Sequence, residues 1–181
     1  DTLTKEDILV LAGSIPNTLP EDIYEKILAS LESKGIRIVV DATKDLLLNV
    51  LKYHPFLIKP NNHELGEMFG TVCKTDEDIV HYAKKLQEKG AVNVLISMAG
   101  DGAILITEDG QNIKMGTPKG KVVNSVGAGD SMVAGFITGY IRGGNYEEAL
   151  KSGTAAGSAT AFSEGLASLE MYEKMLKQIT E

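Results

Sequence analysis

In the first half of the chain, short continuous runs of apolar residues alternate with longer segments in which apolar residues recur at helical spacing. Short runs rich in Val, Ile and Leu, each closed by Gly, Pro or polar residues, predict strands at 8–12, 37–42, 56–59 and 92–97. Between them, apolar residues at helical spacing predict helices at 19–33, 44–51 and 76–89. Thr75 is suited to cap the last of these helices. This β-α-β-α-β order predicts a parallel sheet with helices on both faces.

The second half of the chain has a different pattern. Two apolar stretches flank Glu108-Asp109-Gly110, a turn sequence that predicts a β-hairpin from 103–107 and 112–116. The rest is mostly helical, with a segment of small residues at 146–162 and a last helix at 168–179. Small side chains let two helices, or a helix and a flat ligand, approach closely. Because no repeat or linker is evident, we predict one α/β domain over residues 1–181, a three-layer α/β/α core with a β-hairpin.

Composition and charge narrow the classes of function. The 181 residues are 43% hydrophobic and 24% charged, which is typical of a globular protein, and the formal net charge is −7. This charge disfavours nucleic acid as a partner, and no apolar run is long enough to cross a membrane. Cys73 is the single cysteine, which excludes an internal disulfide and indicates a reducing compartment such as the cytoplasm. An anionic ligand would therefore have to be held locally, by backbone N–H groups, a few lysines or a metal ion.

The start of the chain lacks both an initiator Met and a charged-then-apolar leader. We therefore expect no signal peptide, and we expect that a segment upstream of Asp1 has been removed.

The most informative stretch is Asn124-Ser125-Val126-Gly127-Ala128-Gly129-Asp130, which precedes a long helical pattern. The first N–H groups of a helix have no internal partners, and glycine lets a ligand come close to them. The stretch therefore predicts a phosphate site at Gly127, Ala128 and Gly129. Asp130 would repel an anion there unless it serves as a base that takes a proton from an attacking hydroxyl. The plainer interpretation, a tight turn with an acidic residue in the first helical turn, stays open.

Three further stretches follow predicted strands. Asn61 and Glu64 have the spacing of a helix capping box, and their oxygen atoms also suit Mg²⁺, held directly or through its waters. The stretch from Ser97 to Gly102 is either a plain turn or a second glycine-rich loop facing a nucleotide. Gly13-Ser14, after the first strand, is a small loop that matters only if a substrate lies above that strand. The three histidines lack metal-ligand spacing, and Cys73 is expected to be a plain thiol.

Together these motifs resemble those of the ribokinase-like (PfkB) carbohydrate kinases. Residues 124–131 are similar to the C-terminal signature of that family, which usually has Asp-Thr where this chain has Asn124-Ser125. Lys59-Pro60-Asn61-x-x-Glu64 resembles the family's metal-associated motif, and Ser97-x-x-Gly100-x-Gly102-Ala103 resembles its nucleotide loop. The order and spacing of all three motifs agree with the family, which is far more specific than any one motif alone.

The resemblance implies a ribokinase-like fold and transfer of the γ-phosphoryl group of ATP to a sugar-phosphate hydroxyl, with Mg²⁺. It implies that Asp130 is the base, that Gly127, Ala128 and Gly129 form the anion hole, and that Asn61 and Glu64 hold the metal, through water. It further implies that the sugar phosphate contacts Gly13, Ser14 and Asp130. The implied nucleotide contacts are Ser97, Gly100, Asp101, Gly102, Gly129, Ala156 and Thr160.

The resemblance also suggests the acceptor. Asn124-Ser125, the Lys-Pro-Asn form and residues 161–165 are most similar to family members that convert fructose 1-phosphate to fructose 1,6-bisphosphate. The alternatives are tagatose 6-phosphate, another sugar or a vitamin as acceptor, or a nucleotide-binding or partner-binding module without catalysis. Family members are longer, and their N-terminal part supplies further strands, a β lid and most sugar contacts. We therefore expect this chain alone to turn over little, and an unpaired sheet edge would favour a homodimer.

Overall fold

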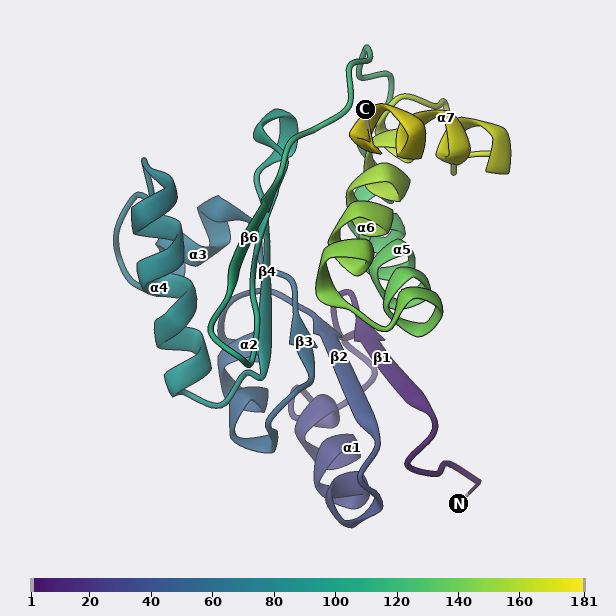
Figure 1. Ribbon diagram of the computed structural model, residues 1–181. Coiled ribbons are helices and arrows are strands. Elements are labelled where there is room, and N and C mark those ends of the chain that lie inside the picture. Colours follow the sequence, from purple (N-terminus) through teal and green to yellow (C-terminus); the bar gives the residue numbers. More distant parts are fainter. Residues whose placement is uncertain (1, 181) are drawn as a thin grey trace. The chain divides into compact units, whose positions relative to one another are not determined.

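The computed structural model describes residues 2–180, with the elements labelled in Figure 1. The strands are β1 (Ile8–Ala12), β2 (Arg37–Asp41), β3 (Leu57–Ile58), β4 (Asn93–Ser97), β5 (Ala103–Ile106) and β6 (Asn112–Met115). The α-helices are α1 (Ile23–Leu31), α2 (Lys44–Val50), α3 (Asn62–Met68), α4 (Asp76–Glu88), α5 (Ala128–Gly143), α6 (Tyr146–Ala161) and α7 (Leu169–Thr180). Short 3₁₀ helices are present at Glu32–Lys34, Leu51–Tyr53 and Ala99–Asp101.

The strands form one six-stranded sheet in the order β1-β2-β3-β4-β5-β6. The first four strands pair in parallel, with Ile8 opposite Arg37, Val39 opposite Leu57 and Ile58 opposite Val94. These pairs confirm the predicted parallel sheet and the α/β fold class. By contacts the chain divides into two compact units. The first unit contains the residues up to 96 and 106–111, and the second contains 97–105 and the residues from 112 on. The single domain expected over residues 1–181 stays a prediction.

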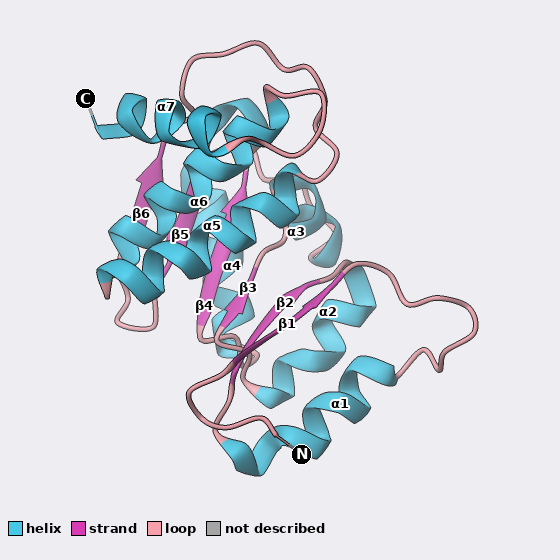
Figure 2. Cartoon of the chain, turned by 90° about the vertical axis from the view of Figure 1, so that its right-hand side faces the viewer, coloured by secondary structure: helices cyan, strands magenta, loops and turns pink. Residues whose placement is uncertain are grey.

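The core of the first unit is formed by the parallel strands and the helices beside them (Figure 2). Consecutive residues of β2, β3 and β4 have no exposed surface, so these strands are buried on both faces, as expected for a parallel sheet. They are Val39, Val40, Leu57, Ile58, Val94, Leu95 and Ile96. The helices add fully buried leucines from α1, α2 and α4: Leu28, Leu47 and Leu86. Burying these side chains positions the carboxyl ends of β1 to β3, where the candidate residues of this unit follow.

Helix α1 is shorter than the predicted helix at 19–33. It begins at Ile23, and the preceding residues form turns in which Leu19 N–H donates to the Pro16 carbonyl and Ile23 N–H donates to the Pro20 carbonyl. The residue before a proline is disfavoured in helical conformation, so Pro20 prevents Leu19 from starting the helix. Leu19 is accordingly exposed and does not join the core.

The second unit is built around the helix pair α5 and α6, with α7 packed on α6. Glycines bring the two backbones of the pair into close approach: a Cβ on Gly135 would lie 2.6 Å from the Ser152 carbonyl oxygen, and one on Gly139 would lie 2.6 Å from that of Glu148. Gly153 and Gly157 on α6 are crowded in the same way by Met132 and Ala128 of α5. Part of the small-residue segment therefore serves close helix packing.

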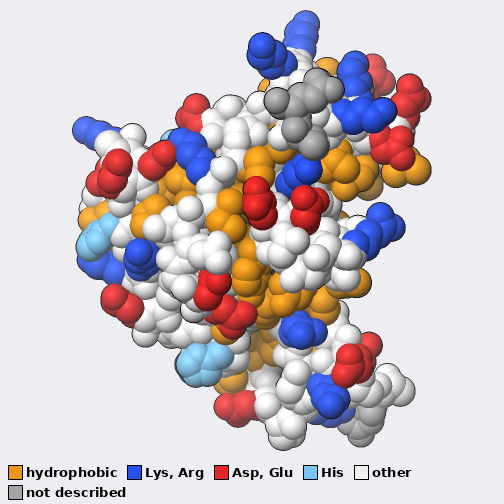
Figure 3. Space-filling view, viewed as in Figure 1, with side chains coloured by type: hydrophobic (Ala, Val, Ile, Leu, Met, Phe, Trp, Pro, Cys, Tyr) orange, Lys and Arg blue, Asp and Glu red, His pale blue; other side chains and the backbone are white. Residues whose placement is uncertain are grey.

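The surface carries both signs of charge. On the face shown in Figure 3, acidic and basic side chains are interspersed and form no continuous basic stripe among the described residues. Between residues 2 and 180, no helix has the length and apolar character that a membrane span requires.

Candidate active site

The glycine turn at 124–130 leads into α5 as predicted. Gly127 is the N-cap of α5 and has φ +80°, in the left-handed region that favours glycine. A Cβ at this position would lie 3.2 Å from Cδ2 of Leu166, so neighbouring atoms also leave little room for a side chain. Asp130 is the third residue of the helix and is exposed. The turn therefore presents a carboxylate in the first turn of α5, next to the unpaired N–H end of the helix.

The N–H groups of this turn are only partly available. Val126 N–H donates to the Asn124 side-chain oxygen at 3.0 Å, and Ala128 N–H donates to the Ser125 carbonyl at 3.2 Å. Ala128 was expected to contribute to the anion hole, and this intrachain bond removes it from the set of free donors. Within residues 2–180, the N–H groups of Gly127, Gly129 and Asp130 have no partner. The free donors are thus the two glycines and Asp130 itself.

The start of α5 is held by the end of α6. The Thr160 hydroxyl donates to Ser131 Oγ at 2.8 Å and accepts the Ala167 N–H at 3.3 Å, and Thr160 is 1% exposed. Asn124 and Val123 N–H groups both donate to the Ala161 carbonyl, and the Asn124 side-chain amide donates to the Glu164 carbonyl. These bonds fix the position of the glycine turn. Sequence patterns gave no signal for the Thr160–Ser131 contact, because the two residues are far apart in the chain.

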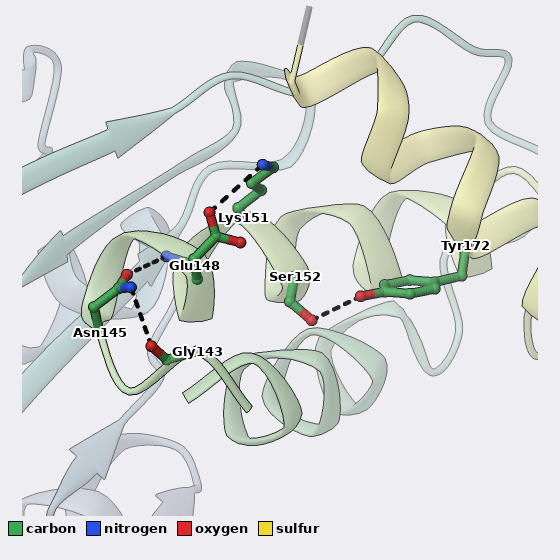
Figure 4. Close-up of polar contacts among 6 residues, drawn as sticks. All are labelled: Gly143, Asn145, Glu148, Lys151, Ser152 and Tyr172. Atoms are coloured by element: carbon green, nitrogen blue, oxygen red, sulfur yellow. Dashed lines mark hydrogen bonds and ion pairs between the residues drawn. The ribbon is translucent and has the colours of Figure 1, made fainter. Parts of the chain in front are cut away.

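A cavity of about 470 Å³ lies in the second unit beside these residues. Ala156 and Thr160, two of the expected nucleotide contacts, line it together with Ser131, Leu166 and Tyr172. In Figure 4 the Tyr172 hydroxyl of α7 points to Ser152 Oγ of α6, and their oxygens are 3.0 Å apart. The same view shows Asn145 at the N-cap of α6, where its side-chain oxygen accepts the Glu148 N–H at 2.8 Å.

The loop from Ser97 to Gly102 is a compact connection between β4 and β5. Met98 N–H donates to the Gly102 carbonyl at 2.8 Å, and Gly102 lies so close to the backbone of Met115 that no side chain fits there. Gly100 and Asp101 are exposed, Ser97 is half-buried, and Gly100 N–H has no partner in the described chain. The loop is therefore a tight turn that also leaves one glycine N–H free.

In the first unit, Asn61 and Glu64 form a complete capping box at the start of α3. The Asn61 side-chain oxygen accepts N–H bonds from His63 at 2.9 Å and Glu64 at 2.8 Å, and Asn61 N–H donates to Glu64 Oε2 at 2.8 Å. The capping prediction is confirmed. The amide oxygen of Asn61 has no capacity left for a direct metal bond, whereas Glu64 Oε1 has no bond to the described chain. No group of three or more His, Cys, Asp or Glu residues able to hold a metal occurs in the described residues.

The carboxyl ends of β1, β2 and β3 carry a second polar group. Gly13 follows β1, has φ +85° and donates its N–H to the Asp41 carbonyl at 3.0 Å. Lys59 follows β3, is 7% exposed, and its Nζ lies 3.3 Å from Asp41 Oδ1. Sequence reasoning used Lys59 only as part of a motif and passed over Asp41. The sequence signal that could have indicated this ion pair is the opposite charge of two residues, Asp41 and Lys59, that each lie at the end of a predicted apolar strand.

Cys73 agrees with its expected role as a plain thiol. It is half-buried, and burial, followed by the nearby Asp78 carboxylate, raises the pKa of its thiol. A raised pKa keeps the thiol protonated at neutral pH, which makes it a poor nucleophile.

Comparison with known proteins connects these features to a family. The model of the pfkB family of carbohydrate kinases matches residues 1–171 of the chain. The chain belongs to the pfkB family. This membership confirms the resemblance carried by the three motifs at residues 59–64, 97–103 and 124–131.

Curated relatives match nearly the whole chain. The 1-phosphofructokinase of Bacillus subtilis (strain 168) is 50% identical over 178 residues, which is 98% of this chain and 58% of that protein. The D-tagatose-1-phosphate kinase of Bacillus licheniformis is 38% identical over 172 residues, which is 94% of this chain and 56% of that protein. The chain therefore spans little more than half the length of the curated relatives it matches.

Solved structures show the same fold. Phosphofructokinase-2 from Escherichia coli, crystallised with substrates and products, has a TM-score of 0.91 and 27% identity over 99% of this chain and 59% of that one. Ribokinase from Arabidopsis thaliana has a TM-score of 0.79 at 24% identity, covering 94% of this chain and 55% of that one. The ribokinase-like fold class is confirmed by both.

Proposed function

We propose that this chain provides the nucleotide site and the catalytic base for transfer of the γ-phosphoryl group of ATP to fructose 1-phosphate, giving fructose 1,6-bisphosphate. The observation that carries the proposal is the exposed Asp130 in the first turn of α5, directly after the free N–H groups of Gly127 and Gly129. Family membership and the similarity to a 1-phosphofructokinase support the choice of reaction and acceptor.

Asp130 would accept the proton of the attacking hydroxyl. Because that hydroxyl belongs to the sugar phosphate, Asp130 would contact the sugar phosphate as well. Phosphoryl transfer depends mainly on positioning and on stabilising charge in the transition state. The N–H groups of Gly127, Gly129 and Asp130 would hold the oxygens of the phosphoryl group, and each such donor can contribute on the order of 3 kcal/mol. Ala128 would contribute to the shape of the turn, because its N–H is already bonded.

The remaining residues of the second unit would bind the nucleotide. Gly100 N–H is free, and Ser97 and Asp101 are at least partly exposed, so this loop can contact phosphate or ribose. Gly102 would act by allowing the tight turn. Ala156 lines the cavity in the second unit, which supports an adenine contact. Thr160 also lines this cavity, but its hydroxyl is bonded to Ser131, so it would contribute to the shape of the cavity and not donate a hydrogen bond to the nucleotide.

In the first unit, Asn61 and Glu64 would position Mg²⁺. The donor set fits an ion that keeps its own waters, because only Glu64 Oε1 is free to accept a bond. When bound, Mg²⁺ would offset phosphate charge, and Asn61 would orient Glu64 through the capping box. Gly13 and Ser14, at the carboxyl end of β1, would contact the sugar phosphate.

A chimera tests the function, because the 181 residues alone are expected to bind ATP weakly and to turn over little. The chain replaces the matched 178-residue segment of the Bacillus subtilis relative. We expect ATP-dependent phosphorylation of fructose 1-phosphate, measured by coupled ADP release. ATP binding without any phosphorylation would contradict the proposal and favour a non-catalytic nucleotide-binding module. Ordinary turnover by the 181 residues alone would contradict the expected dependence on additional chain.

The second candidate acceptor is a tagatose phosphate. The 38% identity to a D-tagatose-1-phosphate kinase supports tagatose 1-phosphate in particular. The same chimera distinguishes the acceptors when the two ketose 1-phosphates and tagatose 6-phosphate are compared by kcat/KM.

A homodimer also stays a proposal. It is supported by β1, which is the first strand in the sheet order and pairs with β2 in the described chain.

A further inference from the structure

Tyr24 connects α1 to the end of β1 through two hydrogen bonds. Its hydroxyl donates to the Ala12 carbonyl at 2.8 Å and lies 3.1 Å from the Gly13 carbonyl, so it bridges two consecutive peptide carbonyls. Tyr24 is 8% exposed, and its ring packs in the core of the first unit. A buried hydroxyl that serves two carbonyls of one turn restrains the direction of both peptide planes.

Gly13 is held from its other side as well. Its N–H donates to the Asp41 carbonyl at 3.0 Å, which extends the contact between β1 and β2 by one residue beyond the pair Ala12–Asp41. Both backbone polar groups of Gly13 are thus engaged while its φ is +85°. A Cβ on Gly13 would meet no atom within 4 Å, so neighbouring atoms do not exclude a side chain. Glycine is favoured here because of the positive φ alone.

The restraint on Gly13 determines where Ser14 points its N–H group. In a trans peptide the C=O of one residue and the N–H of the next point in opposite directions. Because the Gly13 carbonyl faces Tyr24, the Ser14 N–H faces away from Tyr24. Ser14 is exposed, and neither its N–H nor its hydroxyl has a partner within residues 2–180. The turn therefore presents two donors of one residue, held by a buried tyrosine.

We propose that Tyr24 is a positioning residue for the sugar phosphate: its hydroxyl holds the Gly13–Ser14 turn so that the Ser14 donors face the ligand. The inference rests on the proposed function, because it assumes that this turn contacts the sugar phosphate. An ordinary tyrosine is already protonated at neutral pH, and burial, followed by the nearby Asp41 carboxylate, raises the pKa of the Tyr24 hydroxyl further. Tyr24 itself makes no contact with the ligand in this arrangement.

Tyr24→Phe tests the inference, because it keeps the packed ring and removes only the hydroxyl. Binding of fructose 1-phosphate and of MgATP to the chimera described above is measured by ¹⁵N NMR titration, with the Ser14 amide as the reporter for the sugar phosphate and the Gly129 amide as the reporter for the nucleotide. Loss of the hydrogen bonds should raise the Kd for fructose 1-phosphate about five- to tenfold and leave the Kd for MgATP unchanged. Amide hydrogen exchange at Ser14 should become faster in the variant even without ligand.

Tyr82→Phe is the matched control. Tyr82 lies on α4 of the same unit, and its hydroxyl has no hydrogen bond in the described chain, so both Kd values should stay at wild-type levels. An unchanged Kd for fructose 1-phosphate in Tyr24→Phe would overturn the inference and leave the proposed function intact. Equal weakening of both ligands with a lower thermal midpoint would overturn it in favour of a purely structural role. No binding of fructose 1-phosphate by the chimera with wild-type Tyr24 would overturn the proposed substrate and the inference together.

Discussion

Gly127 is restricted by its own backbone and by its neighbours at once. Its φ of +80° disfavours residues with a side chain, and Leu166 and Thr160 would lie 3.2 Å and 4.0 Å from an added Cβ. Thr160 in turn bonds to Ser131, next to Asp130. The conformation of one glycine, the packing of the α6–α7 connection and the position of the proposed base therefore depend on one another.

Asp130→Asn is expected to separate binding from catalysis. In the chimera it should lower kcat by about 10²–10⁴-fold, because the amide cannot accept the proton of the attacking hydroxyl. The Kd for MgATP should change little, because the side chain of Asp130 makes no contact with the nucleotide in the proposed arrangement and its backbone N–H is kept. Stopped-assay turnover and calorimetric titration measure the two quantities.

Asp45→Asn is the matched control for Asp130→Asn, because Asp45 is also an exposed aspartate in the first turn of a helix, here α2. It should leave both turnover and ATP binding at wild-type levels. Near-normal turnover in Asp130→Asn would rule out its assignment as the base.

The pair α5 and α6 shows how small residues act at the scale of an element. Gly135 and Gly139 on α5 face carbonyl oxygens of α6, and Gly153 and Gly157 on α6 face α5 in return. Glycine inside a helix is unfavourable by about 1 kcal/mol relative to alanine. The close packing that these glycines allow offsets this cost, and it places the first turn of α5 next to the last turn of α6.

Gly135→Ala should therefore destabilise the chain in spite of the higher helix propensity of alanine. Its Cβ would lie 2.6 Å from the Ser152 carbonyl oxygen and 2.7 Å from Cβ of Ala156, so the helices must move apart. The expected loss in the free energy of unfolding is about 1–3 kcal/mol, measured by urea denaturation. Gly165→Ala, where an added Cβ meets open space, should be close to neutral. A Gly135→Ala variant more stable than wild type would show that the two helices separate at little cost.

The sequence predicted those features that depend on local patterns. The parallel strands, the Thr75 and Asn61 caps and the glycine turn before α5 all lie where the pattern placed them. Features that depend on contacts between distant residues were not predicted. The Tyr24–Gly13 and Thr160–Ser131 bonds join different elements. The bond from Ala128 N–H to the Ser125 carbonyl is local, but a turn sequence does not specify which of its N–H groups are engaged.

The whole chain is acidic while its proposed ligands are anions. A formal net charge of −7 creates a repulsive field for ATP and for a sugar phosphate at long range. Backbone N–H groups such as those of Gly127 and Gly129 act over short distances and carry no net charge. A divalent ion bound together with ATP would reduce the charge that the chain has to accommodate, and we expect it to strengthen nucleotide binding.

Removal of Mg²⁺ should consequently weaken ATP binding by at least about tenfold, a difference of about 1.4 kcal/mol, measured by titration with excess EDTA and with millimolar Mg²⁺. Glu64→Gln should reduce this difference. A glutamine oxygen can still accept the Asn61 N–H and preserve the cap, while the negative charge that attracts the hydrated ion is gone. Equal affinity with and without Mg²⁺ in the wild-type chain would contradict a metal role for Glu64. A Glu64→Gln variant with the full wild-type dependence would instead place the ion at other residues.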